Sequence, residues 1–144
     1  MIGAIIGDVI GSTREFSPVA RRDFELFPYG TDYTDDSLMT IAQGMAFFSW
    51  QKLEDSERTE QRLSGLLVQS MQEMGRRFPE PLGAYGGRFG AWLFEDNPHP
   101  YNSWGNGSAM RVSAAAECAK SLEEALKFAE ISAAVTHNHP EGIK

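Results

Sequence analysis

Apolar residues recur three and four positions apart in most segments of this chain, and no segment alternates apolar with polar residues. A spacing of three and four places side chains on one face of an α-helix, whereas a half-buried strand needs strict alternation. The pattern therefore predicts an all-α fold. The expected helices cover residues 2–11, 35–51, 56–77, 109–119 and 122–136, with one more short helix near 88–94.

The first two expected helices differ in which faces are apolar. The segment 35–51 is apolar on nearly all sides, so we expect it to be central and buried. The segment 2–11 carries one apolar stripe, and its glycines Gly3, Gly7 and Gly11 share another face. Because glycine has no side chain, that face is expected to let another backbone approach closely.

Two long stretches between the helices, 12–33 and 79–108, have the glycine and proline content of loops. Loops of this length in a compact domain are often functional. At the end of the chain, Pro140 suits the first position of a helix that then has no body. We therefore expect a single domain over residues 1–144 that is a truncated part of something longer.

Composition excludes several classes of function. The formal net charge is −7 over 144 residues, which argues against a nucleic-acid backbone or an anionic membrane as a main partner. The single cysteine, Cys118, allows no internal disulfide and no cysteine-based zinc site. The apolar N-terminus is interrupted by Asp8 and lacks a basic segment, so it is not a signal peptide. A cytoplasmic location is expected.

Thr34, Asp35 and Asp36 place one hydroxyl and two carboxylates at the head of the central helix. Adjacent carboxylates repel each other unless a cation or a proton lies between them. A hard cation such as Mg²⁺ or Mn²⁺ suits a cluster made only of oxygen ligands. The alternative is a plain helix N-cap, which satisfies free N–H groups at the positive end of the helix dipole.

Three further segments carry candidate chemistry. Glu15 could act as a general base, or it could be a solvated glutamate paired with an arginine. The glycine-containing run 102–111 could receive a phosphate through backbone N–H groups, or it could be a turn with an N-cap at Ser108. His137 and His139 could contact a ligand, since a zinc site would lack further partners here.

These segments, taken in order, resemble the ADP-ribosylglycohydrolase family, which includes dinitrogenase reductase-activating glycohydrolases and ADP-ribosyl hydrolases. The resemblance lies in residues 3–11 with Glu15, the run Thr34-Asp35-Asp36-Ser37, the run 103–111 and the run 136–142. Together they span essentially the whole chain. The resemblance implies a helical bundle with a binuclear Mg²⁺ or Mn²⁺ centre that hydrolyses the bond between ADP-ribose and a modified acceptor.

The resemblance also implies roles for individual residues. Thr34, Asp35 and Asp36 match metal ligands, and Glu15 matches the residue that positions or activates water. His137 matches a contact to ADP-ribose. The residues matching the loop around the diphosphate are Asn102, Ser103 and Trp104, followed by Gly105, Asn106 and Gly107.

The chain departs from the family in one respect. It has no second metal-ligand motif of the form Asp-x-Asp-Thr or Asp-x-Asp-Ser. We therefore expect an incomplete second metal site and weak metal affinity, and this chain could be inactive alone. Apolar surface left exposed would favour self-association. The alternatives are a non-catalytic ADP-ribose-binding or regulatory module, and a structural helical domain.

Overall fold

The computed structural model describes residues 1–144, and it is helical throughout. Its α-helices are α1 (Ile2–Gly11), α2 (Asp35–Gln51), α3 (Glu60–Arg77), α4 (Gly87–Leu93), α5 (Ser113–Cys118), α6 (Leu122–Ala134) and α7 (Pro140–Ile143). Three short 3₁₀ turns are η1 (Ser12–Arg14), η2 (Asp55–Glu57) and η3 (Asn106–Ser108). The only β-type pairing is an isolated bridge between Thr34 and Leu82. The all-α prediction is confirmed.

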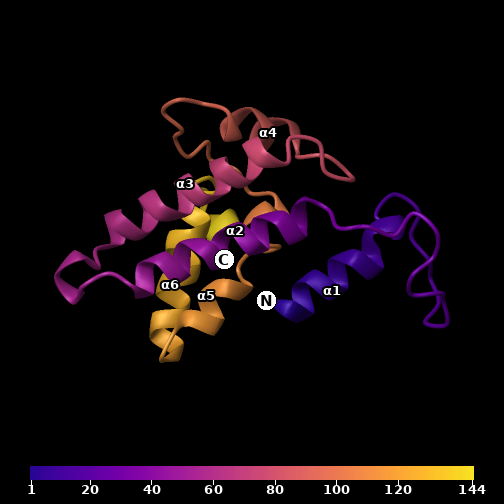
Figure 1. The fold of residues 1–144 in the computed structure, drawn as a ribbon, viewed down its shortest axis with the longest axis horizontal. Helices are drawn as coiled ribbons and strands as arrows, with labels where there is room; N and C mark the ends of the chain where they lie inside the picture. Colours follow the sequence, from indigo (N-terminus) through magenta and orange to yellow (C-terminus); the bar gives the residue numbers. More distant parts are fainter.

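Helix α2 runs through the middle of the molecule, as Figure 1 shows. Helix α3 packs along one side of α2, and α5 and α6 lie on another side. Helix α1 projects outward at the end of the molecule where α2 begins. The core forms where these helices meet. Its buried apolar side chains are Leu38, Met39, Ala42, Ala46, Phe47, Leu63, Leu67, Met71, Phe89, Trp92, Leu93, Ala114, Ala115, Phe128 and Val135.

Local chemistry explains where the longer helices begin. The side chains of Thr34, Thr59 and Ser121 each accept a hydrogen bond from a backbone N–H in the first turn of α2, α3 and α6. Each such cap typically contributes about 1 kcal/mol. Helix α3 begins at Glu60 and not at 56, because the reciprocal capping box between Glu54 and Glu57 closes a separate turn first.

Helix α5 is shorter than the predicted helix over 109–119. It begins at Ser113, since residues 106–108 form a 3₁₀ turn and residues 109–112 continue as turns. The backbone N–H groups of Ala109 and Met110 both donate to the carbonyl of Asn106. This tight turn keeps the glycine-containing run 102–111 folded as a loop.

Helix α1 lies on the outside of the molecule, and none of its residues is buried. Side chains built on Gly3, Gly7 or Gly11 would meet nothing within 4 Å. The expectation that these glycines admit another backbone within this chain is therefore wrong, because no element packs on that face. Ile2 is 75% exposed.

Helix α2 is central but not buried on every side. Ile41, Met45 and Phe48 lie on its outer side, with Phe48 59% exposed. The exposed apolar surface expected from the sequence is therefore present on both α1 and α2. None of the helices has the length and hydrophobicity needed to cross a membrane.

Candidate functional site

Asp8, on the inner side of α1, holds the beginning of α2. Its Oδ2 accepts hydrogen bonds from the backbone N–H of Thr34 at 2.9 Å and from the N–H and Oγ of Ser37 at 3.1 and 2.5 Å. Its Oδ1 accepts from Thr34 Oγ1 at 2.6 Å. A carboxylate at this end also complements the helix dipole. One side chain thus fixes where the following two carboxylates point.

Thr34 is the N-cap of α2, and its side chain is buried. Its hydroxyl donates to Asp8 and accepts from the N–H of Asp36 at 3.2 Å. A hydroxyl has one hydrogen and two lone pairs, so one lone pair remains. The N-cap alternative is therefore present in the structure, and it leaves one lone pair of the Thr34 hydroxyl unused.

Asp35 and Asp36 follow Thr34 in the first turn of α2, where both are half-buried. Burial, followed by the neighbouring charge of Asp36, raises the pKa of Asp35 to about 6. Burial raises the pKa of Asp36 as well, with the charges of Asp8 and Glu15 adding to it. The site therefore gathers negative charge that a cation would relieve.

Glu15 reaches the same site from the turn after α1. Its carboxylate lies against Gly83, where an added Cβ would sit 2.7 Å from Oε2. Gly83 has a φ of +81°, in the left-handed region that favours glycine. The loop that follows Pro81 is held near α2 by the bridge between Thr34 and Leu82. Glycine at position 83 thus makes the space that Glu15 occupies.

A cleft of about 470 Å³ joins these groups to distant parts of the chain. We call it the carboxylate cleft. Of the residues predicted for the site, it is lined by Glu15, Asp35, Asp36, Ser103, Gly105, Asn106, Gly107 and His137. Thr34, Asn102 and Trp104 do not line it. The cleft thus brings together segments that are up to 122 positions apart, from Glu15 to His137.

The loop from Asn102 to Gly107 forms one wall of the carboxylate cleft. The N–H of Asn102 is already used, since it donates to the side chain of Asn138 at 2.7 Å. The N–H groups of Ser103, Asn106 and Gly107, which line the cleft, make no hydrogen bond within the chain. Because such groups attract anions, these three are the loop's candidate donors to a phosphate. The Trp104 side chain is 73% exposed, and its ring lies near that of His139.

His137 also lines the carboxylate cleft and is buried. Its Nδ1 lies 2.7 Å from the hydroxyl of Thr136. Burial, followed by the nearby charge of Arg111, lowers the pKa of His137 to about 4. The imidazole is therefore neutral near pH 7. It can exchange hydrogen bonds with a ligand without adding a positive charge to the cleft.

Sequence reasoning missed several residues of the site. Asp8, Arg111 and Thr136 lie within the runs that resemble the family, but their roles depend on contacts between distant segments, which no local pattern shows. Arg88 also lines the cleft, with its guanidinium 4.7 Å from the centroid of the Tyr101 ring. Arg88 was detectable in part, since it is a cation in a loop region rich in glycine and aromatic residues.

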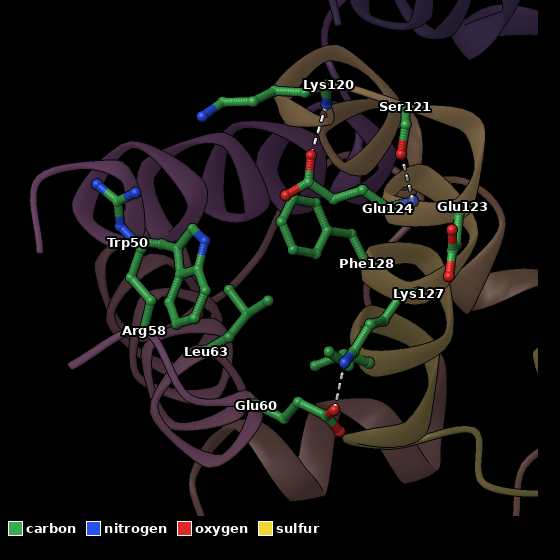
Figure 2. Close-up of a pocket in the computed structure, with 11 residues that line it drawn as sticks. Trp50, Arg58, Glu60, Leu63, Lys120, Ser121, Glu123, Glu124, Lys127 and Phe128 are labelled. Atoms are coloured by element: carbon green, nitrogen blue, oxygen red, sulfur yellow. Dashed lines mark hydrogen bonds and ion pairs between the residues drawn. The ribbon is translucent and has the colours of Figure 1, made fainter. Parts of the chain in front are cut away.

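A second cleft, of about 530 Å³, lies at the other end of α2 (Figure 2). Figure 2 shows Trp50, Leu63 and Phe128 at its apolar side, and Lys127 paired with Glu60 across it at 2.6 Å. The sequence predicts none of its residues for the site. Its rim carries three basic and three acidic side chains, Arg58, Lys120 and Lys127 with Glu60, Glu123 and Glu124, so it favours neither anions nor cations.

The donor set at the head of α2 fits a hydrated hard cation. It offers the carboxylates of Asp35 and Asp36 and the free lone pair of Thr34, and Mg²⁺ commonly keeps several of its waters. No three His, Cys, Asp or Glu side chains converge as a complete metal cluster would. Water or another ligand would therefore complete the coordination.

Comparison with known proteins gives one match. A family model described as ADP-ribosylglycohydrolase matches residues 1–144, which is the whole chain. Neither the curated proteins nor the solved structures contain a match.

Proposed function

Because the chain belongs to the ADP-ribosylglycohydrolase family, whose members act on ADP-ribose linkages, we propose that it cleaves the glycosidic bond between ADP-ribose and a modified acceptor. The observation that supports this proposal is the carboxylate cleft. It is lined by Glu15, by two half-buried aspartates and by residues of the loop from Ser103 to Gly107, which is a candidate to bind an anion. A diphosphate and a ribose need both kinds of group within reach of each other.

The loop and His137 are assigned to the diphosphate. The N–H groups of Ser103, Asn106 and Gly107 would donate to phosphate oxygens, and Arg88 adds a positive charge to the cleft. In a protein of net charge −7, backbone donors attract a phosphate locally without a cluster of lysines. This places the ribose that carries the scissile bond toward Glu15 and Asp35.

Glu15 is assigned the role of general base. It would take a proton from a water that attacks the anomeric carbon of that ribose. A bond forms between the water oxygen and that carbon, and the bond from the carbon to the acceptor breaks. The electron pair leaves with the acceptor, which gains a proton. Glu15 is suited to this role because it is solvent-accessible and is held beside Gly83 at the edge of the cleft.

Asp35, Asp36 and Thr34 are assigned to a Mg²⁺ or Mn²⁺ ion. When bound, such an ion would supply positive charge that orients ribose hydroxyls and polarises water. The pKa values of Asp35 and Asp36 are raised, and a bound cation would lower them by stabilising the ionised carboxylates.

Isothermal titration with ADP-ribose, with and without Mn²⁺, and an assay of ADP-ribose release from arginine- and serine-linked peptides test this proposal. We expect metal-dependent binding, and we expect Glu15→Gln to slow release by about 10²-fold while binding persists. Glu25→Gln, in the exposed loop before α2, is the matched control. Full activity of Glu15→Gln would contradict the assigned base. Binding of ADP-ribose with no release from any substrate would instead identify a non-catalytic binding module.

A further inference from the structure

Arg111 is a buried cation without an acidic partner. Its side chain is 0% exposed, and none of the ion pairs in the chain involves it. Its Nε and Nη1 have no hydrogen-bond partner, and its guanidinium lies 5.5 Å from the centroid of the Phe89 ring. A buried charge without a counter-ion is costly. An apolar side chain of similar size would fill the same space without that cost, so packing does not account for an arginine here.

The one short hydrogen bond of Arg111 leads to His137. Its Nη2 donates to Thr136 Oγ1 at 2.7 Å and, less closely, to the carbonyl of Ser132 at 3.4 Å. The same Thr136 oxygen lies 2.7 Å from Nδ1 of His137. All three side chains are buried, so water does not compete for these bonds. The three residues form a chain of contacts that ends at the wall of the carboxylate cleft.

The hydrogen bonds that link Arg111, Thr136 and His137 can be arranged in only one consistent way. A guanidinium only donates, so Thr136 Oγ1 must accept from Arg111. The Thr136 hydroxyl then has its own hydrogen to place, and His137 Nδ1 is its only other partner. The hydroxyl therefore donates to Nδ1, which must carry a lone pair. In a neutral imidazole the hydrogen then lies on Nε2.

The Nε2 side of the ring faces the loop that is assigned to the ligand's phosphates. A Cβ built on Gly107 would lie 3.3 Å from Nε2, and one built on Gly105 would lie 4.0 Å from it. Both glycines and His137 line the carboxylate cleft. A hydrogen on Nε2 is thus presented to an acceptor atom bound in the cleft, whereas a hydrogen on Nδ1 would point into the protein.

We infer that Arg111 is a positioning residue that acts through Thr136 to hold His137 as the Nε2–H tautomer, so that the ring donates a hydrogen bond to an anionic oxygen of the ligand. Without Arg111, the Thr136 hydroxyl could turn and accept from Nδ1, and either tautomer would be satisfied. The assignment of that oxygen to a diphosphate rests on the proposed function. The tautomer itself does not.

Nitrogen NMR of ¹⁵N-histidine-labelled protein at pH 7 tests the tautomer directly, in the absence of ligand. We expect the His137 Nδ1 signal of an unprotonated acceptor and the Nε2 signal of a protonated nitrogen. A protonated Nδ1 in the native protein would overturn the inference without the need for any variant. His99 and His139 provide internal references in the same spectra.

Variants then test the route from Arg111. In Thr136→Val and Arg111→Met we expect the two nitrogen signals of His137 to move toward each other, because the two tautomers mix. Thr136→Ser keeps the hydroxyl, so we expect it to show the native pattern. Thr40→Val is the matched control, because it removes a buried threonine hydroxyl that contacts the carbonyl of Met110 and not His137. Native signals in folded Thr136→Val would overturn the inference.

Titration with ADP-ribose separates this inference from the proposed function. If both hold, Thr136→Val should weaken binding about tenfold and Thr136→Ser should restore it. If the native protein shows the Nε2–H signature and binds no ADP-ribose, the tautomer inference stands and the proposed function fails. If the protein binds ADP-ribose and His137 is protonated on Nδ1, the proposed function stands and this inference fails.

Discussion

At the scale of single residues, Gly83 controls the position of Glu15. Substitution by alanine adds a methyl group 2.7 Å from Oε2 of Glu15 and imposes a side chain on a backbone with a φ of +81°. We expect Gly83→Ala to lose about 1 kcal/mol of stability from the backbone conformation. We also expect it to displace Glu15 and slow hydrolysis at least about tenfold.

Gly30 provides the control for this prediction. It has a φ of +90°, and an added Cβ would meet nothing within 4 Å. Gly30→Ala should therefore lose similar stability, measured by urea unfolding, without slowing hydrolysis. Equal rates for the two variants would show that contact with Gly83 does not position Glu15.

His137 predicts a pH dependence of stability. Its pKa is lowered from 6.5 to about 4 in the folded protein, so the unfolded chain binds more protons between these values. The free energy of unfolding should therefore gain a contribution of about 3 kcal/mol as the pH rises through this window, and lose it as the pH falls. Above pH 6.5 the contribution is constant.

Comparison with His137→Gln isolates this contribution. Asp35 acts in the opposite direction, because a carboxyl whose pKa is raised favours the folded state at low pH and loses that effect as the pH rises. Asp35 is common to both proteins, so its effect cancels when their unfolding free energies are subtracted at each pH. His99→Gln, at an exposed position, should keep the native dependence. A pH-independent difference between native protein and His137→Gln would contradict the prediction.

At the scale of the elements, α3 secures the end of α4 and hence one wall of the carboxylate cleft. The Nε2 of Gln72, on α3, donates to the carbonyl of Trp92 at 3.3 Å and to that of Glu95 at 2.8 Å. The Trp92 carbonyl also accepts from the N–H of Glu95 at 3.3 Å, whereas the Glu95 carbonyl, just beyond α4, has Gln72 as its only donor. Residues at the beginning of α4 line the cleft.

We expect Gln72→Ala to lower the free energy of unfolding by about 1–2 kcal/mol, since it leaves the carbonyl of Glu95 without a donor. Gln69→Ala is the control on the same helix. Gln69 is exposed and bonds only to Glu73, so its change should stay within about 0.5 kcal/mol. Urea unfolding measures both, and equal losses would contradict the role given to Gln72.

At the scale of the whole molecule, we propose that two copies associate through the exposed apolar surface of α1 and α2. On α2, Met45 is 50% exposed and Phe48 59% exposed, and on α1, which packs against α2, Ile2 and Ile6 are exposed as well. Apolar surface gathered on neighbouring helices commonly marks an interaction site. Met45→Glu would place a charge in such an interface and should raise the dissociation constant at least about tenfold.

Sedimentation equilibrium measures this association. Leu126→Glu is the control, because Leu126 is 64% exposed but lies on α6, away from the α1–α2 surface. A monomer at all concentrations, or equal effects of the two substitutions, would contradict the proposal.

Local sequence determined which segments form helices. The apolar spacing in 2–11, 35–51 and 122–136 predicts α1, α2 and α6, and in the structure Ser121 caps α6. These signals depend only on residues within one turn of each other. Where a turn competed with a helix, as before Glu60 and Ser113, periodicity alone placed the boundary four residues too early.

Local sequence also identified the chemical groups of the site, because carboxylates, glycines and a histidine stand out in an otherwise apolar pattern. Glu15, Asp35 and His137 were found in this way, and the structure brings them to one cleft. Their assigned roles stay predictions until the measurements above are made.

Only the tertiary structure decided how these groups are held. Asp8 meets Thr34 across 26 positions of sequence, and Arg111 meets Thr136 across 25. The directions of hydrogen bonds between such residues depend on the path of the whole chain, which no local period encodes. Helix α1 shows the same limit: its glycine face predicted a neighbouring backbone, and the chain packs none there. The sequence gives the type of each side chain, but a side chain acquires its hydrogen-bond partner only when distant segments pack together.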